Sequence, residues 1–89
     1  MVEDIYDTGH SFSTLLAKLR EFEPKSLKTC VMLHKMNAVN LKYKFTNDYV
    51  GFYIPNLFVI GAGLDFNEHF RDLQYVAVIS QAAIQDFKA

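Results

Sequence analysis

The sequence opens with carboxylate residues that run directly into a Thr-Gly turn. Residues 2–11 read Val-Glu-Asp-Ile-Tyr-Asp-Thr-Gly-His-Ser, and a helical repeat of apolar residues begins near Ser11. We expect an apolar strand to end at Glu3 and Asp4, and a short loop to join that strand to the helix. The loop and the helix N-terminus would present backbone N–H groups without helical partners, which favours an anion. The segment therefore predicts an anion-binding turn between a strand and a helix.

The acidic residues beside this turn point to a metal ion as well. Glu3, Asp4 and Asp7 would repel a phosphate group unless a divalent cation lay between them and the phosphate. Mg²⁺ is commonly held by one or two carboxylates together with the phosphates of a substrate. We therefore expect Mg²⁺ and a sugar-phosphate ligand here. The alternative is a solvated acidic turn that only begins a helix.

Composition limits the class of protein. The 89 residues are enough for one small domain, and the apolar fraction of 51% excludes a disordered chain. A net charge of −1 without a basic run argues against a nucleic-acid-binding domain. A single cysteine, no secretory signal and no apolar stretch of membrane-spanning length favour a cytoplasmic setting. Because only Met1 and Val2 precede Glu3, we expect the chain to be a piece of a larger domain whose first strands are missing.

Apolar periodicity predicts alternating strands and helices. The helix begins near Ser11, capped by Ser11 or Ser13, and ends at Glu23-Pro24 because the residue before proline avoids the helical conformation. The other expected elements are strands at Leu27–Leu33, Tyr49–Ile54, Leu57–Ile60 and Tyr75–Ile79, loops at 36–47 and 65–72, and a terminal helix capped by Ser80. A strand, a helix and a second strand make a βαβ unit with parallel strands. The predicted fold class is α/β, with ligand groups at the carboxyl ends of strands.

Three segments resemble a known enzyme family. Glu-Asp-x-x-Asp-Thr-Gly-x-Ser at 3–11 resembles the phosphoribosyl pyrophosphate (PRPP) binding loop of type I phosphoribosyltransferases. Residues 50–61, Val-Gly-Phe-Tyr-Ile-Pro-Asn-Leu-Phe-Val-Ile-Gly, and 64–73, Leu-Asp-Phe-Asn-Glu-His-Phe-Arg-Asp-Leu, are similar to the C-terminal half of hypoxanthine-guanine phosphoribosyltransferases. The resemblance implies a partial phosphoribosyltransferase domain over residues 1–89. Its parallel sheet would carry flanking helices, a PRPP-binding loop at 3–11 and a purine-binding region at 35–71.

The resemblance implies a purine salvage enzyme that requires Mg²⁺. Such an enzyme transfers the 5-phosphoribosyl group of PRPP to hypoxanthine or guanine, giving IMP or GMP and pyrophosphate. Members of the family generally form homodimers or homotetramers. We expect the 89 residues alone to bind PRPP weakly and to turn over slowly or not at all.

The resemblance assigns the sugar-phosphate side of the site to the first turn. Glu3 and Asp4 match groups near the ribose hydroxyls and Mg²⁺, and Asp7 matches the general base or acid at purine N7. The amides of Asp7 to Ser11 would hold the 5′-phosphate, with the Thr8 and Ser11 hydroxyls. The PRPP-binding residues implied there are Glu3, Asp4, Asp7, Thr8, Gly9, His10 and Ser11.

The purine and pyrophosphate side falls on later residues. Lys35 matches the lysine that reads the purine 6-oxo group, and Phe58 matches the ring stacked on the base. The backbone of Val59 matches a group that bonds the purine edge. Asp65 matches a carboxylate near a second Mg²⁺, and Arg71 matches the cation that faces pyrophosphate. In relatives Arg and Thr usually follow the lysine, whereas Met36 and Asn37 follow it here.

Two other functions remain open from the sequence. The first is a PRPP-binding or interaction protein that has lost catalysis, against which the retained Asp7 argues. The second is a receiver-like signalling domain whose acidic cluster binds Mg²⁺. A receiver domain does not predict the Thr-Gly-x-Ser turn beside the acids, so it fits the sequence poorly.

Overall fold

The computed structural model describes residues 1–37 and 45–88, which fall into two compact units. The first unit covers Met1–Asn56, and the second begins at Leu57. Each unit is considered by itself below. Residues 38–44 of the loop predicted at 36–47 lie outside the described residues.

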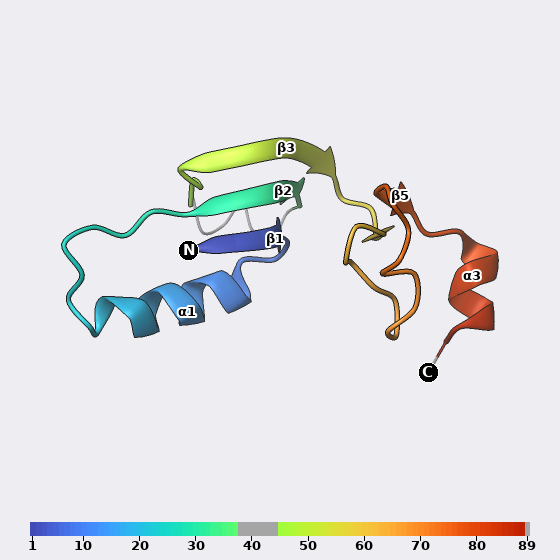
Figure 1. Ribbon diagram of the computed structural model, residues 1–89, viewed down its shortest axis with the longest axis horizontal. Helices are drawn as coiled ribbons and strands as arrows, with labels where there is room; N and C mark the ends of the chain where they lie inside the picture. Colours follow the sequence, from blue (N-terminus) through green and yellow to red (C-terminus); the bar gives the residue numbers. More distant parts are fainter. Residues whose placement is uncertain (38–44, 89) are drawn as a thin grey trace. The chain divides into compact units, whose positions relative to one another are not determined.

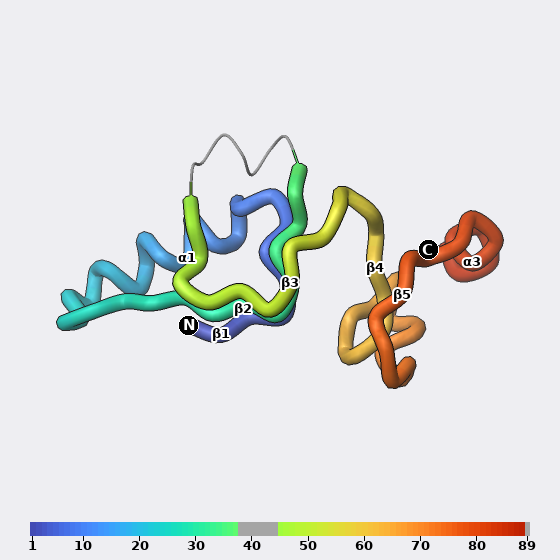
Figure 2. Tube along the Cα trace, turned by 90° about the horizontal axis from the view of Figure 1, so that it is seen from above, coloured from blue at the N-terminus to red at the C-terminus, as the bar shows by residue number. Residues whose placement is uncertain are grey.

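The first unit is a three-stranded parallel sheet with one helix (Figure 1). The elements are β1 (Val2–Tyr6), α1 (His10–Arg20), β2 (Cys30–Met36) and β3 (Tyr49–Pro55), and the strand order is β1-β2-β3. Both strand pairs are parallel, as the βαβ pattern predicts. Figure 2 shows α1 running along one side of this sheet.

The core of the first unit forms where α1 meets the end of β1. Tyr6, Phe12 and Val31 are buried together, and the Tyr6 and Phe12 rings meet edge to face at 4.8 Å between centroids. Leu16, one helical turn after Phe12, is also buried. Phe22 belongs to the same apolar repeat in the sequence but lies past the helix end and is 76% exposed. Within the repeat, Phe12 and Leu16 are therefore the buried positions, Leu19 is half-buried, and Phe22 does not contribute to the core.

Two strand boundaries differ from the prediction. β1 does not end at Glu3 and Asp4 but continues to Tyr6, because its backbone stays paired with β2 as far as His34. The second strand runs from Cys30 to Met36 rather than from Leu27 to Leu33. It begins late because its neighbours β1 and β3 offer ladder partners only from Cys30 onward. The carboxyl ends of β1 and β2, where ligand groups are expected, therefore lie two or three residues later in the sequence than predicted.

The ends of α1 also differ from the prediction. The N-cap is Gly9, in the left-handed conformation with φ 93°, and no side chain caps the helix. Ser11 therefore lies inside the first turn, and the Ser13 hydroxyl donates back to the Gly9 carbonyl oxygen at 2.8 Å. The helix ends at Arg20 rather than at Glu23-Pro24. The next three amides, those of Glu21, Phe22 and Glu23, bond three residues back instead of four, and Glu23 takes up a left-handed φ of 51°. Gly9 thus sets the direction in which the helix leaves β1.

The second unit contains a short antiparallel pair and a short helix. Val59–Ile60 (β4) pairs with Ala77–Val78 (β5), and α3 covers Gln81–Asp86. Both strands are shorter than predicted, because only two residues of each find a ladder partner. The predicted Ser80 cap is confirmed, since its hydroxyl oxygen accepts a hydrogen bond from the Ala83 amide at 3.1 Å. Within the described residues, no helix has the length and apolarity to cross a membrane.

His34 lies buried in the middle of the first sheet. It pairs in register with Tyr6 on β1 and Tyr53 on β3, and its ring stacks on Tyr6 with centroids 4.6 Å apart. The Asn47 side-chain nitrogen lies 3.1 Å from His34 Nδ1. Burial lowers the pKa of His34 below 6.5, because desolvation disfavours the charged imidazolium.

The lowered pKa predicts how stability depends on pH. The unfolded chain binds a proton at His34 at a higher pH than the folded chain, so this stabilisation is complete above about pH 6.5 and is lost as pH falls through the folded pKa. The free energy of unfolding should decrease from pH 7.5 to pH 5, with a slope of up to about 1.4 kcal/mol per pH unit. Denaturant melts across this range should show a flatter slope for His34→Gln. The matched His10→Gln, at an exposed histidine, should keep the original slope, and equal slopes in all three proteins would contradict the assignment.

Candidate functional site

The turn between β1 and α1 forms a small cavity lined by backbone. Its volume is about 180 Å³, and it is lined by Ile5, Asp7, Thr8, Gly9, Ser11 and Phe12. Because a water molecule occupies about 30 Å³ of liquid, this is room for about six waters or for a phosphate-sized anion. The cavity coincides with the loop that the sequence predicts to bind phosphate.

Several N–H groups of this turn are available to a ligand. The first helical bond of α1 runs from the Ser13 amide to the Gly9 carbonyl oxygen, and the Thr8 hydroxyl oxygen accepts from the His10 amide at 3.4 Å. In the part of the chain that the structure describes, no hydrogen-bond partner is found for four other amides, those of Thr8, Gly9, Ser11 and Phe12. Unpaired amides at a helix N-terminus make a site suited to an anion.

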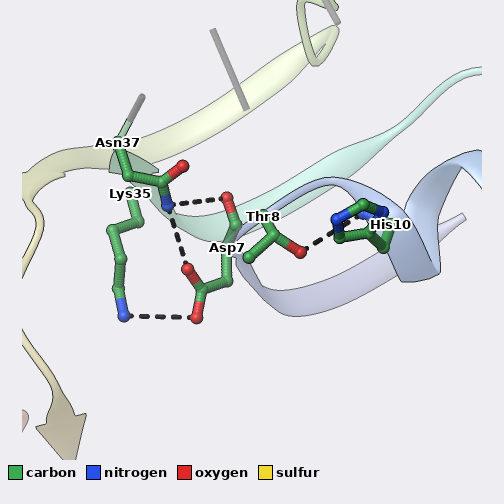
Figure 3. Close-up of polar contacts among 5 residues, drawn as sticks. All are labelled: Asp7, Thr8, His10, Lys35 and Asn37. Carbon is green, nitrogen blue, oxygen red and sulfur yellow. Dashed lines mark hydrogen bonds and ion pairs between the residues drawn. The ribbon is translucent and has the colours of Figure 1, made fainter. Parts of the chain in front are cut away.

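Asp7 is held by two side chains from the end of β2 (Figure 3). Lys35 Nζ lies 3.3 Å from Asp7 Oδ2, and the Asn37 side-chain nitrogen donates to Asp7 Oδ1 at 3.0 Å. The same Asn37 nitrogen donates to the Asp7 backbone oxygen at 3.1 Å. The structure thus brings together two residues that the sequence assigns to the site, Asp7 and Lys35, which lie 28 positions apart.

The burial of this ion pair is uneven. The Lys35 side chain is 7% exposed, whereas that of Asp7 is 50% exposed. A buried ammonium needs a partner because desolvation of an unpaired charge is costly. Lys35 is therefore anchored inside the unit, while one side of the Asp7 carboxylate stays open to solvent and to a ligand.

Glu3 and Asp4 are not brought together. They are neighbours in β1, so their side chains point to opposite faces of the sheet. Both residues are exposed, and Asp4 Oδ1 accepts from the Ile5 amide at 2.7 Å. Among residues 1–37 and 45–88, no group of three His, Cys, Asp or Glu residues is placed to hold a metal ion. One carboxylate with substrate oxygens still meets the usual requirements of Mg²⁺.

Asp65 and Arg71 form an ion pair in the second unit. Arg71 Nη2 lies 3.4 Å from Asp65 Oδ2, and Arg71 Nη1 donates to the Gly63 carbonyl oxygen at 3.0 Å. Asp65 also accepts from the Glu68 amide at 2.8 Å. Left-handed φ values at Asn67, Glu68 and Phe70 mark a strained segment between them. Such strain is typical of ligand-binding loops.

Phe58 and Val59 lie at the start of β4 and offer a ring and a strand edge. The Phe58 ring is half exposed and meets Phe66 edge to face at 5.7 Å. The Ile79 amide donates to the Phe58 carbonyl oxygen, which makes the opposed pair of Val59 and Val78 a non-hydrogen-bonded one. The Val59 N–H and C=O therefore face away from β5, as a group that bonds a ligand edge would require.

The contribution of Asn37 was missed in the sequence. The usable signal was its spacing, because residues two apart in an extended segment face the same side. Asn37 lies two positions after Lys35, so both side chains reach the same partner. In the sequence, Asn37 stands out only as a departure from the family pattern.

Comparison with known proteins identifies the relatives of this chain. No protein-family model matches it. The hypoxanthine-guanine phosphoribosyltransferases of *Rattus norvegicus* and *Homo sapiens* are 45% and 46% identical to it over all 89 residues. The chain is a relative of the hypoxanthine-guanine phosphoribosyltransferases. It spans 40% of the length of these two relatives. The phosphoribosyltransferase domain-containing protein 1 of *Xenopus tropicalis* is 42% identical over 88 residues, which are 38% of its length.

For a hypoxanthine-guanine phosphoribosyltransferase relative, the parallel sheet and helix of the first unit are the expected α/β architecture. The predicted resemblance is therefore confirmed at the level of family and fold class.

Gly9 offers a direct test of the cavity. At φ 93° an alanine is strained, and Gly9→Ala should lower the free energy of unfolding by about 1–2 kcal/mol. It should also weaken binding of inorganic phosphate about tenfold, because the amides of the turn shift and at least one hydrogen bond to the anion is lost. Calorimetric titration with phosphate measures this loss.

Gly63→Ala is the matched control. Its φ is 95°, and no atom lies within 4 Å of the added Cβ. The substitution should therefore cost about as much backbone strain as Gly9→Ala, but it lies in the second unit and leaves the β1–α1 turn unchanged. Equal phosphate affinity in both variants would show that the Gly9 turn does not hold the anion.

Proposed function

We propose that the chain serves purine phosphoribosyl transfer, in which hypoxanthine or guanine and PRPP give IMP or GMP and pyrophosphate. The observation that carries this proposal is the turn from Asp7 to Phe12. There a cavity and an oriented carboxylate lie beside four amides, those of Thr8, Gly9, Ser11 and Phe12, for which no partner is found among the described residues. The family relationship supplies the substrate class. The activity would require the parts of the fold that this chain, at 40% of its relatives' length, does not include.

The 5′-phosphate of PRPP is the ligand we assign to the cavity. Its oxygens would accept from the amides of Thr8, Gly9 and Ser11, and from the hydroxyls of Thr8 and Ser11. The positive end of the α1 dipole adds a favourable field for a dianion. His10 adds a further side chain at the helix start, where its ring is exposed.

Magnesium fits the carboxylates in this proposal. Glu3 and Asp4 each present an exposed carboxylate in the first unit, and Asp65 presents one in the second unit; these are the residues that would hold the metal. The metal held there would supply positive charge that stabilises the negative charge building on the leaving pyrophosphate. Arg71 would act in the same direction, since a guanidinium matches the oxygens of a phosphate group.

Asp7 is the residue we assign to proton transfer. As purine N9 bonds to C1′ of the ribose and pyrophosphate leaves, the proton on N7 becomes acidic and passes to the Asp7 carboxylate. The half-exposed Asp7 side chain can face the base, while Lys35 and Asn37 hold its two oxygens. General base catalysis of this kind contributes about 10²–10⁴-fold in rate.

Purine recognition is assigned to Phe58, Val59 and Lys35 by the family resemblance. The Phe58 ring offers a π-face for stacking, and the Val59 backbone offers a donor and an acceptor at an open strand edge. Lys35 would donate to the 6-oxo group of the purine. We assign a homodimer or homotetramer in the cytoplasm to the complete enzyme, following the family resemblance.

A second candidate is a protein that binds PRPP without turning it over. The name of the *Xenopus tropicalis* relative specifies a phosphoribosyltransferase domain and no reaction. This candidate shares the phosphate cavity but does not need an oriented Asp7. PRPP binding without formation of IMP or GMP would favour it.

Asp7→Asn tests the assigned proton transfer. Asparagine cannot accept the N7 proton, so in the full-length enzyme, which this assay and the next one use, IMP formation from hypoxanthine and PRPP should fall about 10²–10⁴-fold. A radiolabelled hypoxanthine assay with Mg²⁺ measures this loss. The Kd for PRPP should change by less than about threefold, an effect under 1 kcal/mol. The exposed Asp72→Asn should leave both quantities unchanged, and near-normal turnover in Asp7→Asn would remove Asp7 from the mechanism.

Phe58→Ala tests the proposed stacking. Loss of a base–aromatic contact costs about 1–3 kcal/mol, so the KM for hypoxanthine should rise at least about fivefold. The KM for PRPP should stay near its original value in the same steady-state assay. Phe52→Ala, which removes another well-exposed ring, is the control. Equal rises in both KM values would indicate a packing role for Phe58.

A further inference from the structure

Asn37 makes contacts with Asp7 that no assigned role explains. Its side-chain nitrogen donates both to the Asp7 backbone oxygen, at 3.1 Å, and to Asp7 Oδ1, at 3.0 Å. An asparagine amide carries two N–H donors, so both are directed at one residue. Asn37 itself is 9% exposed, which places these bonds away from competing water.

The two bonds restrict the Asp7 side chain. The Asn37 side-chain nitrogen bonds both the carboxylate and the backbone carbonyl oxygen of Asp7. These two bonds together restrict rotation about the Cα–Cβ and Cβ–Cγ bonds of Asp7. Lys35 holds the other carboxylate oxygen at 3.3 Å. The two carboxylate oxygens of Asp7 are thus each contacted by a different side chain. The carboxylate therefore has a defined plane while half of the side chain remains open.

We propose that Asn37 is a positioning residue that sets the orientation in which Asp7 meets the purine N7–H. The purine in this inference comes from the proposed function. The restraint of Asp7 by Asn37 rests on the hydrogen bonds alone. A lysine alone would not fix the plane, because an ammonium is a rotatable point charge with three equivalent donors. The planar amide of Asn37 supplies the directional restraint.

The matched variants are Asn37→Leu and Asn56→Leu in the full chain. Leucine has a branched shape like that of asparagine but lacks both donors, and Asn56 is exposed, so its replacement controls for the added apolar side chain. In NMR spectra of protein labelled at aspartate, side-chain couplings of Asp7 should report one rotamer in the unchanged chain and in Asn56→Leu. Asn37→Leu should give averaged couplings. A single unchanged rotamer in Asn37→Leu would overturn the proposal.

A binding experiment separates positioning from a merely structural role. Hypoxanthine carries the N7 nitrogen that Asp7 is proposed to meet, and 7-deazahypoxanthine lacks it. Asn37→Leu should reduce the preference for hypoxanthine about tenfold, the loss expected for one hydrogen bond to a charged group. Affinity for inorganic phosphate should stay within about twofold, because the amide cavity is retained. Equal losses for both purines and for phosphate would show a structural role only.

The same measurements distinguish the two proposals. If the unchanged chain does not prefer hypoxanthine over its 7-deaza analogue, the assignment of Asp7 to N7 fails, while the rotamer result still decides whether Asn37 holds Asp7. If the unchanged chain shows the preference and Asn37→Leu keeps it, the positioning role fails and the proposed function stands.

Discussion

The parallel pairing of β1 with β2 is the constraint on which the site depends. It places Tyr6 opposite His34, so the residues that follow each strand leave the sheet at the same edge. Asp7 follows the last residue of β1, and Lys35 lies near the end of β2, so a carboxylate and an ammonium group from distant parts of the sequence lie within 3.3 Å of each other. A slip of one residue in this register would turn Lys35 to the other face. The stacked Tyr6 and His34 rings and the core contact of Tyr6 with Phe12 oppose such a slip.

The same edge supplies two different chemistries. The left-handed Gly9 turns the chain sharply from β1 into α1, so the first-turn amides face a cavity instead of a strand. Beside them, the Asp7 carboxylate is fixed by neutral and charged donors. The anion site, formed by amides between Thr8 and Phe12, directly follows Asp7, the proposed general base. Such an arrangement suits a substrate that carries a phosphate at one end and reacts at the other. This proximity explains why residues 3–11 alone predict an anion-binding turn beside a functional carboxylate.

Much of this arrangement could be predicted from sequence, and the rest depends on tertiary contacts. Local pattern was sufficient for α1, β3 and the Ser80 cap, because spacing and capping chemistry act between near neighbours. The ends of β1 and β2 were placed wrongly, because they depend on partners across the sheet rather than on apolar runs. Asp7 and Lys35 were assigned through family resemblance. Asn37 was not, because its role depends on a contact 30 positions away.

The most direct test is an NMR titration of the chain with PRPP and Mg²⁺, in which the backbone amide resonances of the β1–α1 turn are followed. The account predicts that the amides of Thr8, Gly9, Ser11 and Phe12 shift together with a single dissociation constant, and that omitting Mg²⁺ weakens binding. Shifts that avoid these four amides, or that are the same with and without Mg²⁺, would contradict it.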